Sequence, residues 1–329
     1  MTLTPHSSWN IVDSTKIQSF MDCPRSYFYE YMLGWRPIDA NIHLEFGKAW
    51  HLAMEHLIIE FGKDGKYTGK AVQEGWNLLN DHYRKFFPIL MDESYHPKTP
   101  GFALRALAEY TVTYAADQFT PLYTEIAGTV PIRGDKVLHF RMDSILSTPD
   151  GVKSREHKTG SQLSRQWTDQ WALKIQTGTY NHVLYCLFPE DQVWGVEING
   201  TIFNKTKIQF QRVPTRQKKD MMQTWFWNVN HWVEMIEWEM DRLMSKCNEG
   251  DPIMFAFPQN TENCTKYFGC KYHDYCRAWA NPLQHLEDIP AGMHNEYWNP
   301  ADEETEVKNV FTIGQDGLVS VKTKETVNE

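Results

Sequence analysis

The sequence predicts an α/β fold in which a β-sheet core is wrapped by helices. A hairpin pattern lies near the middle of the chain, where two strand-like runs, 139–147 and 152–158, flank a Pro-Asp-Gly turn at 149–151. Further strand-like runs stand on either side of this hairpin, and helical apolar spacing precedes and follows them. The additional strands are expected at 121–133, 192–202 and 207–213.

Helices are expected before and after this core. Ser14 or Thr15 can cap a short helix, Pro24 suits the first turn of another, and the remaining helices follow from apolar residues spaced three or four apart. They are expected at about 14–35, 42–61, 69–87, 101–120, 162–188 and 216–247. We expect one domain over 1–295 with its metal-binding core at about 121–213. Residues 296–329 would be an acidic, peripheral extension, with a small hairpin at 310–321.

Composition excludes several classes of protein. A chain of 329 residues with 13 Trp can bury a large core, so it is globular rather than disordered. No apolar run is long enough to span a bilayer, and the polar N-terminus lacks the pattern of a signal peptide. We therefore expect a cytoplasmic protein with reduced thiols and no membrane partner. The net charge of −9 argues against binding nucleic acid through the whole surface.

The hairpin carries a set of charged residues typical of a divalent-metal site. Asp143 lies within its first run, and Glu156 and Lys158 lie near the end of the second. Because residues two apart in a strand share a face, Glu156 and Lys158 point the same way and His157 points the other. Two carboxylates beside an amine suit Mg²⁺ or Mn²⁺. The alternative is an exposed hairpin with solvated charges.

Other residues could join this site. Gly47 and His51 share a helix face, as do Gln176 and Tyr180. Taken alone, Gly47 and His51 also fit an ordinary helical glycine and a core histidine. Glu125, in the preceding strand, is either an acid that supports the site or a surface residue.

One stretch of the chain, 205–219, is strongly basic. It is a candidate edge for contacts with phosphates, and a solvated connection between elements is the alternative. Its cations are Lys205, Lys207, Arg212, Arg216, Lys218 and Lys219.

Three cysteines, Cys264, Cys270 and Cys276, fall within thirteen residues near the C-terminus. In a reducing compartment such a cluster indicates a metal rather than disulfides. The fourth ligand would be either Cys23 or His273. A Cys₄ set fits an iron–sulfur cluster or zinc, whereas Cys₃His favours zinc.

Taken in order, these stretches resemble the RecB-like branch of the PD-(D/E)xK nuclease superfamily, and within it the CRISPR-associated and AddB-type nucleases with an iron–sulfur cluster, including phage-encoded members. The resemblance covers about 14–280. One departure is the five residues between Cys264 and Cys270, where the family commonly has two. The matching motifs are Cys23-Pro-Arg, Gly47-x-x-x-His51, Asp143, Glu156-His-Lys158-Thr-Gly160, Gln176-x-x-x-Tyr180 and the late cysteines.

The resemblance implies a restriction-endonuclease-like mixed β-sheet core flanked by helices. It also implies roles for particular residues. His51, Asp143, Glu156 and the His157 carbonyl would bind Mg²⁺ or Mn²⁺, and Lys158 would orient the attacking water or stabilise negative charge. Gln176 and Tyr180 would line the site and help to hold DNA. The cofactor, a [4Fe–4S] cluster, would join 14–35 to 260–280 through Cys23, Cys264, Cys270 and Cys276.

Three hypotheses about function follow. The first is a metal-dependent DNA exonuclease acting on single strands or ends in recombination, repair or replication, alone or with other proteins of those processes. The second is a DNA-end-binding or assembly subunit that barely cleaves. The third is a nuclease stabilised by zinc instead of an iron–sulfur cluster. The intact Asp143, Glu156 and Lys158 set favours an active enzyme.

Overall fold

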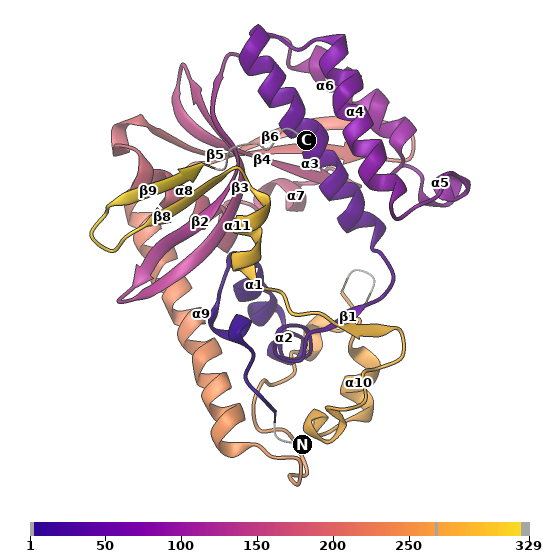
Figure 1. The fold of residues 1–329 in the computed structure, drawn as a ribbon, viewed down its shortest axis with the longest axis vertical. Helices are drawn as coiled ribbons and strands as arrows, with labels where there is room; N and C mark the ends of the chain where they lie inside the picture. The colour runs from indigo at the N-terminus through magenta and orange to yellow at the C-terminus, as the bar shows by residue number, and fades with distance from the viewer. Residues whose placement is uncertain (1–2, 267–268, 324–329) are drawn as a thin grey trace. The chain divides into compact units, whose positions relative to one another are not determined.

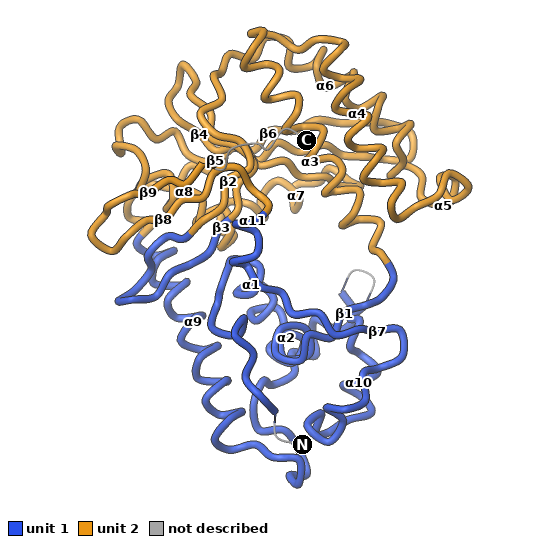
Figure 2. Tube along the Cα trace, viewed as in Figure 1, with its two compact units in different colours: residues 1–39, 129–140, 223–305 blue, residues 40–128, 141–222, 306–329 orange. Residues whose placement is uncertain are grey.

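The computed structural model describes residues 3–266 and 269–323. Its elements follow one another as a helical N-terminal part, a long sheet-forming region and a second helical part (Figure 1). The chain divides into two compact units, each made of three separate segments (Figure 2). Unit 1 comprises 1–39, 129–140 and 223–305, and unit 2 comprises 40–128, 141–222 and 306–329.

A seven-stranded mixed sheet is the largest element of the fold, which confirms the predicted restriction-endonuclease-like α/β class. The strand order is β6-β5-β4-β3-β2-β8-β9. Strands β4 and β5 run parallel, whereas β3–β4, β5–β6 and β8–β9 are antiparallel. The bounds are β2 (Thr120–Arg133), β3 (Lys136–Thr148), β4 (Gly151–Gly160), β5 (Val193–Phe203), β6 (Ile208–Thr215), β8 (Asn309–Ile313) and β9 (Val319–Thr323).

The predicted hairpin at 139–158 is confirmed as β3 and β4. Pro149 and Asp150 form the turn, and Thr148 lies opposite Gly151. The parallel neighbour β5 continues along β4 as far as Gly160 opposite Ile202. The centre of the sheet is therefore the hairpin that carries the predicted acids.

Three helices of unit 2, α3 (Ile42–Asp64), α4 (Gly69–Arg84) and α6 (Pro100–Thr113), pack side by side (Figure 1). Asn41 caps α3 through its side chain, and the left-handed Gly65 ends it. Buried side chains of the three helices form one apolar cluster with Phe203 of β5. Phe46 and Trp50 meet the Phe203 ring edge to face, at 4.9 and 5.2 Å between centroids. This cluster fixes α3, and hence His51, against the sheet.

The predicted helix at 101–120 is shorter than expected and ends at Thr113. The chain turns at Tyr114–Asp117 and enters β2 at Thr120. Asp117, at the end of this turn, accepts hydrogen bonds from Arg155 and Arg212. It therefore forms tertiary ion pairs instead of lying on a helix surface.

The single helix predicted at 162–188 is wrong, because the structure has two, α7 (Arg165–Asp169) and α8 (Ile175–Leu187). Lys174 has an extended backbone, and Thr177 Oγ1 donates to the carbonyls of Trp171 and Lys174 at the break. The break allows Trp167 of α7 to lie over β5, where a Cβ on Gly200 would come within 2.0 Å of its ring.

Unit 1 contains the N-terminal helices and most of the later helical part. A π-helical turn at Phe28–Met32 follows the second helix. Its aromatic core includes Phe20, Tyr27, Phe28 and Phe257, whose rings contact one another. The bounds are α1 (Ser14–Asp22), α2 (Pro24–Tyr27), β1 (Trp35–Pro37), α9 (Lys219–Lys246, in unit 1 from Gln223), α10 (His273–Ala278) and β7 (Met293–Asn295).

Two short helices complete the fold, α5 (Asp92–Tyr95) and α11 (Glu303–Glu306). The hairpin predicted at 310–321 is present as β8 and β9, and it belongs to the large sheet rather than standing apart from it. Strand β8 lies close to β2, since a Cβ on Gly128 would come within 1.8 Å of the Phe311 carbonyl oxygen. The domain boundary at 295 stays a prediction about which residues fold together.

Candidate active site and metal centre

The candidate site begins where the β3–β4 ladder ends. Ser144 opposite Arg155 is the last pair of the register, and Asp143 and Glu156 are the next residues on the two strands. The backbone N–H of His157 donates to Asp143 Oδ2 at 2.6 Å. This bond ties the first acid to β4, the strand that carries the second, so the two acids are held by the fold itself.

Glu156 is held by one side chain of its own strand, Lys158, and by one side chain of helix α8, Gln176. Lys158 Nζ donates to Glu156 Oε1 at 2.6 Å, and Gln176 Nε2 donates to the same oxygen at 3.4 Å. Gln176 also donates to the Tyr180 hydroxyl at 2.9 Å, and that hydroxyl donates to the Arg141 carbonyl of β3. The structure thus brings Gln176 and Tyr180 into one hydrogen-bonded chain with the acids.

His51 reaches the same acids from α3. Its Nδ1 lies 3.0 Å from Asp143 Oδ1, and its side chain is 29% exposed. Its hydrogen-bond partner is a site carboxylate rather than a core group, which favours the functional interpretation. The neighbouring Gly47 has no comparable role, because an added Cβ would lie 3.9 Å from Thr159 Oγ1, an ordinary contact.

Glu125 lies beside His51 and Asp143, which favours the first of its two alternatives, an acid that supports the site. His51, Glu125 and Asp143 each offer a ligand atom, and these atoms lie within 4.8 Å of one another. Glu125 has a positive φ of 42° in β2, and its side chain is 16% exposed. Arg141 donates to its Oε2 at 3.1 and 3.2 Å. Strand alternation alone does not predict this geometry.

His51 and Asp143 shift each other's pKa values in opposite directions, because their charges are opposite. Burial would lower the pKa of His51, but Asp143 outweighs it and raises the pKa to about 9. Burial would raise the pKa of Asp143, but the charge of His51 and its hydrogen bond hold that pKa well below its usual range. In the absence of a metal, the two groups form an ion pair.

The other two carboxyls are shifted upward. Burial, followed by the charge of Asp143, raises the pKa of Glu156. Burial and Asp143 also raise the pKa of Glu125 to about 8, against the opposing effect of Arg141. Several acids in one place, with only partial compensation, are typical of sites that bind a cation.

The residues present fit a hard divalent ion. Glu156 Oε2 is buried and accepts no hydrogen bond from the part of the chain that the structure describes. Such an oxygen costs free energy unless a cation or water satisfies it. One imidazole and several carboxylates are the donors that Mn²⁺ and Mg²⁺ accept, so His51, Asp143, Glu156 and Glu125 suit either ion.

The opposite face of β4 carries a second charged cluster, the Arg155 network. Arg155 Nε donates to Glu197 Oε1 at 2.7 Å, and Lys153 Nζ to Glu197 Oε2 at 3.2 Å. Arg212 binds Asp117 through both of its terminal nitrogens at 2.6 Å, and Arg155 adds a bond to Asp117 at 3.2 Å. This pairing favours the structural alternative for Arg212 over a phosphate contact.

His157 lies on the same face as the Arg155 network. Its Nδ1 is 2.9 Å from Asn199 Nδ2, and Asn199 also donates to the Tyr110 hydroxyl. Burial lowers the pKa of His157 to about 3, so its ring is neutral. The ring thus anchors β4, while the residue's backbone faces the site.

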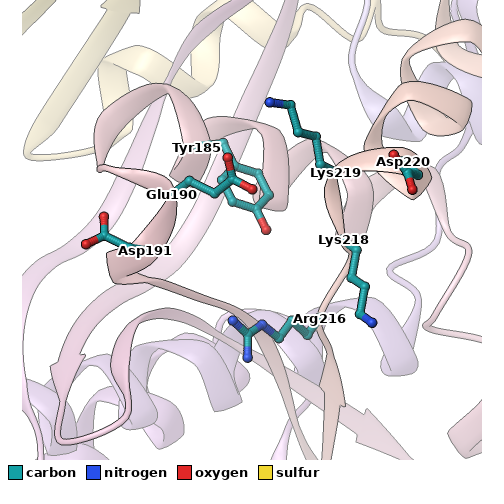
Figure 3. Close-up of a pocket in the computed structure, with 7 residues that line it drawn as sticks. All are labelled: Tyr185, Glu190, Asp191, Arg216, Lys218, Lys219 and Asp220. Atoms are coloured by element: carbon teal, nitrogen blue, oxygen red, sulfur yellow. The ribbon is translucent and has the colours of Figure 1, made fainter.

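Three other cations of the basic stretch, Arg216, Lys218 and Lys219, line an open pocket at the end of α8 (Figure 3). Figure 3 shows Lys218 and Lys219 pointing in opposite directions, so they do not converge on one ligand. Contacts between this edge and DNA phosphates stay a prediction. The pocket is lined by Tyr185, Glu190, Asp191, Arg216, Lys218, Lys219 and Asp220.

Unit 1 holds the four predicted cluster ligands, Cys23, Cys264, Cys270 and Cys276, and Cys23 lies beside the segment at 257–263. Cys23 separates α1 from α2, and the backbone N–H of Asn260 points at its sulfur at 3.4 Å. Asn260 Nδ2 donates to the Asp22 carbonyl at 2.9 Å, and Arg25 Nε donates to the Phe257 carbonyl at 2.9 Å. These bonds join chain segments more than 230 residues apart.

The four cysteines also affect one another electrostatically. Burial raises the pKa of Cys276 to about 11 and raises that of Cys270, and Cys23 and Cys264 contribute in both cases. Among the described residues, no three of the sulfur atoms lie within 4.8 Å of one another. His273, the alternative ligand, has a side chain 42% exposed and beside Asp274.

A mixed sheet that places two acids and a lysine on adjoining strands is the arrangement of a metal-dependent nuclease. The family model of the PD-(D/E)XK nuclease superfamily matches residues 14–277. The chain belongs to this superfamily, as the order of the motifs predicts.

No curated protein matches the chain. The solved structures that match include one titled "Crystal structure of SSO0001", at 12% sequence identity over 69% of this chain and 76% of that chain, with a TM-score of 0.31. Within the described residues, no helix is long and apolar enough to cross a membrane.

Proposed function

We propose that the protein is a metal-dependent DNA exonuclease that acts on single strands or DNA ends. The observation that carries this proposal is the set of Asp143, Glu156 and Lys158 at the end of the β3–β4 ladder, with Glu156 Oε2 left without a hydrogen-bond partner in the described chain. Membership of the nuclease superfamily supports it. The RecB-like, AddB-type branch, a role in recombination, repair or replication, and a cytoplasmic location belong to the same proposal.

Each residue has a role that follows from its position. His51, Asp143 and Glu156 would hold Mg²⁺ or Mn²⁺, together with the carbonyl of His157. Such an ion neutralises a phosphodiester and lowers the pKa of a water molecule. Lys158, fixed 2.6 Å from Glu156, would place its charge where negative charge develops on the phosphate. Gln176 and Tyr180 would keep Glu156 and β3 aligned and contact the DNA.

The test is degradation of end-labelled single-stranded and double-stranded DNA with Mg²⁺, Mn²⁺ or EDTA. We expect metal-dependent release of short products from the ends of single strands. Tight binding of DNA ends with no cleavage in either metal would favour the end-binding subunit instead. Cleavage of circular single strands would replace exonuclease with endonuclease.

His51 offers a sharper test of the metal centre. His51→Ala removes an imidazole donor, so the metal concentration for half-maximal activity should rise about 10- to 100-fold. Mn²⁺ should restore activity better than Mg²⁺, because Mn²⁺ has the higher affinity for mixed N/O sites. Unchanged metal dependence would make His51 a packing residue.

We also propose a [4Fe–4S] cluster held by Cys23, Cys264, Cys270 and Cys276. The hydrogen bonds that bring Cys23 to the 257–263 segment support a shared centre. A tetrahedral zinc with Zn–S bonds of about 2.3 Å needs its sulfur ligands roughly 3.8 Å from one another. Within the described residues, no three of these sulfur atoms lie even within 4.8 Å of one another. Zinc with His273 as the fourth ligand remains the alternative.

Protein purified without oxygen should therefore be brown and contain iron and sulfide. Cys23→Ser should bleach it and lower its melting temperature, because both chain segments lose their common anchor. His273→Ala is the matched control and should keep the colour. Colourless protein that holds one zinc, lost in His273→Ala and kept in Cys23→Ser, would establish the zinc site.

A further inference from the structure

Glu125 and Arg141 lie at the metal centre, yet neither belongs to the nuclease motifs in the sequence. Glu125 comes from β2 and Arg141 from β3, two residues before Asp143. A ligand oxygen of Glu125 is within 4.8 Å of ligand atoms of both His51 and Asp143. Both hydrogen bonds from Arg141 go to a single oxygen of Glu125, Oε2. The Glu125 carboxylate therefore lies between two candidate metal ligands, His51 and Asp143, and the positively charged Arg141.

The backbone of Glu125 is held in an unusual conformation. Its φ of 42° lies in the left-handed region, which non-glycine residues rarely adopt because it is strained. Such strain persists where the surrounding structure over-determines it, and it concentrates at functional sites. The conformation directs this side chain toward His51 and Asp143.

Arg141 is fixed at its backbone and more loosely held at its charged end. The Tyr180 hydroxyl donates to its carbonyl, while its guanidinium binds Glu125 and, at 3.0 Å, Glu306. The Arg141 side chain is 38% exposed and that of Glu306 is 63% exposed. The pair with Glu306 is exposed and therefore weak, whereas Glu125, at 16% exposed, is the partner for which a bound metal would compete.

We propose that Glu125 is a further ligand of the divalent metal and that Arg141 is its exchange partner, which contacts a DNA phosphate once the metal has taken Glu125. The inference rests on the proposed function. A divalent ion attracts a carboxylate more strongly than a guanidinium does, and it prefers oxygen ligands. The guanidinium then has the fork geometry that matches a phosphate. Metal and DNA therefore strengthen each other's binding through this pair.

Metal affinity tests the first half of the proposal without reference to activity. Free Mn²⁺ is measured by electron paramagnetic resonance during titration of the full-length protein, without DNA. Glu125→Gln should weaken binding about 10- to 100-fold, as loss of a ligand or its support does. Arg141→Gln should tighten it, because Glu125 no longer has a competing partner. The matched control is Arg105→Gln, which removes an arginine from an exposed pair with Glu109 and should change nothing.

The coupling tests the second half. Binding of a fluorescent single strand is measured by anisotropy, with and without Ca²⁺ as a metal that supports binding. In the wild-type protein Ca²⁺ should tighten DNA binding about fivefold or more, and Arg141→Gln should abolish that gain. Arg141→Lys keeps the charge but not the fork, so it should retain only part of it. Circular dichroism and melting temperature verify that each variant is folded.

The outcomes separate this inference from the proposed function. Wild-type protein that neither binds Mn²⁺ nor cleaves DNA would overturn the proposed function itself. Wild-type binding and cleavage, with Mn²⁺ affinity unchanged in folded Glu125→Gln, would overturn the inference alone. A gain from Ca²⁺ that survives in Arg141→Gln would also overturn it, because Arg141 would then not carry the coupling.

Discussion

The two faces of β4 carry charges at similar depth but in different states of compensation. On one face, Arg155 and Lys153 share Glu197, and Arg212 pairs with Asp117. On the other, Glu156 keeps one oxygen without a partner in the described chain. Adjacent residues of one strand thus belong to a satisfied network and to an incomplete site.

This difference in charge compensation distinguishes buried charges that stabilise the fold from those that are available for chemistry. In the Arg155 network the cations lower the pKa of Glu197 and of Asp117 despite burial. In the site, burial and the neighbouring Asp143 raise the pKa of Glu156. The cations around a buried acid with a lowered pKa outweigh the effect of burial, whereas those around an acid with a raised pKa, such as Lys158 beside Glu156, do not.

The largest expected effect is the loss of DNA cleavage when charged residues on the metal-site face of β4 are substituted. Glu156→Gln or Asp143→Asn should lower the rate of DNA cleavage by about a thousandfold or more, because each removes charge that holds the metal. Lys158→Ala should also cost orders of magnitude. The melting temperature without metal should fall little in Glu156→Gln, since that acid has no complete set of partners to lose. Rates are measured at saturating Mg²⁺ on end-labelled DNA. Near-wild-type activity in either carboxylate variant would remove the distinction between the two faces.

The second expected effect is a loss of stability when a residue of the Arg155 network, on the other face of β4, is substituted. Glu197→Gln leaves Arg155 and Lys153 partly uncompensated in a buried setting, so the free energy of unfolding should fall by about 3–5 kcal/mol. Activity per folded molecule should stay close to that of the wild type. Urea unfolding measures the first quantity, and cleavage at low temperature measures the second.

Glu109→Gln, on the exposed surface of α6, is the matched control and should cost at most about 1 kcal/mol. A Glu197 variant as stable as this control would show that the Arg155 network adds no net stability. That result would leave conformational specificity as its role.

A third, smaller effect distinguishes the faces by pH in metal-free protein. Burial would raise the pKa of Asp117 and of Glu197, but Arg212 and Arg155 lower them, so their stabilisation is present above about pH 4 and is lost as the pH falls through the lowered values. His51 behaves oppositely. Its pKa is raised to about 9, so its stabilisation is complete below about pH 6.5 and is lost as the pH rises through 9.

Urea unfolding between pH 3 and pH 10 measures the loss of stability toward low pH (the acid limb) and the loss toward high pH (the alkaline limb). Glu197→Gln should flatten the acid limb alone. His51→Gln should flatten the alkaline limb and also part of the acid limb, because His51 holds down the pKa of Asp143. Saturating Mn²⁺ should also reduce the alkaline loss, because metal binding favours the deprotonated imidazole. If Glu197→Gln altered the alkaline limb, the two faces would not titrate independently.

The sequence predicts most of the sheet because its signals there are local. The turn at 149–151 and the flanking runs specify the hairpin, and alternation places Glu156 and Lys158 on one face. The position of Asp143 beside them follows from the length of the hairpin. The union of β8 and β9 with the sheet depends instead on contacts between distant segments, and no local pattern encodes it.

The sequence leaves the role of Glu125 open for a similar reason. Glu125 departs from strand alternation because its φ is positive, which a sequence pattern does not specify for glutamate. One signal was available for another acid, Glu55, which follows His51 by one helical turn and therefore shares its face. Burial raises the pKa of Glu55, and Asp143 adds to that effect. Helix periodicity could have identified it.

The smallest expected effect concerns Gly47, which shares a helix face with His51. If the site required a glycine there, a methyl group would collide with the end of β4. The added Cβ would instead lie 3.9 Å from Thr159 Oγ1, at ordinary contact distance. Because alanine is the better helix former, Gly47→Ala should leave cleavage unchanged and raise the free energy of unfolding by about 0.5–1 kcal/mol. Cleavage assays and urea unfolding check this. A large loss of activity in a stable Gly47→Ala protein would mean that α3 moves closer to β4 when DNA binds, and the glycine would then belong to the active site rather than to the helix packing that supports it.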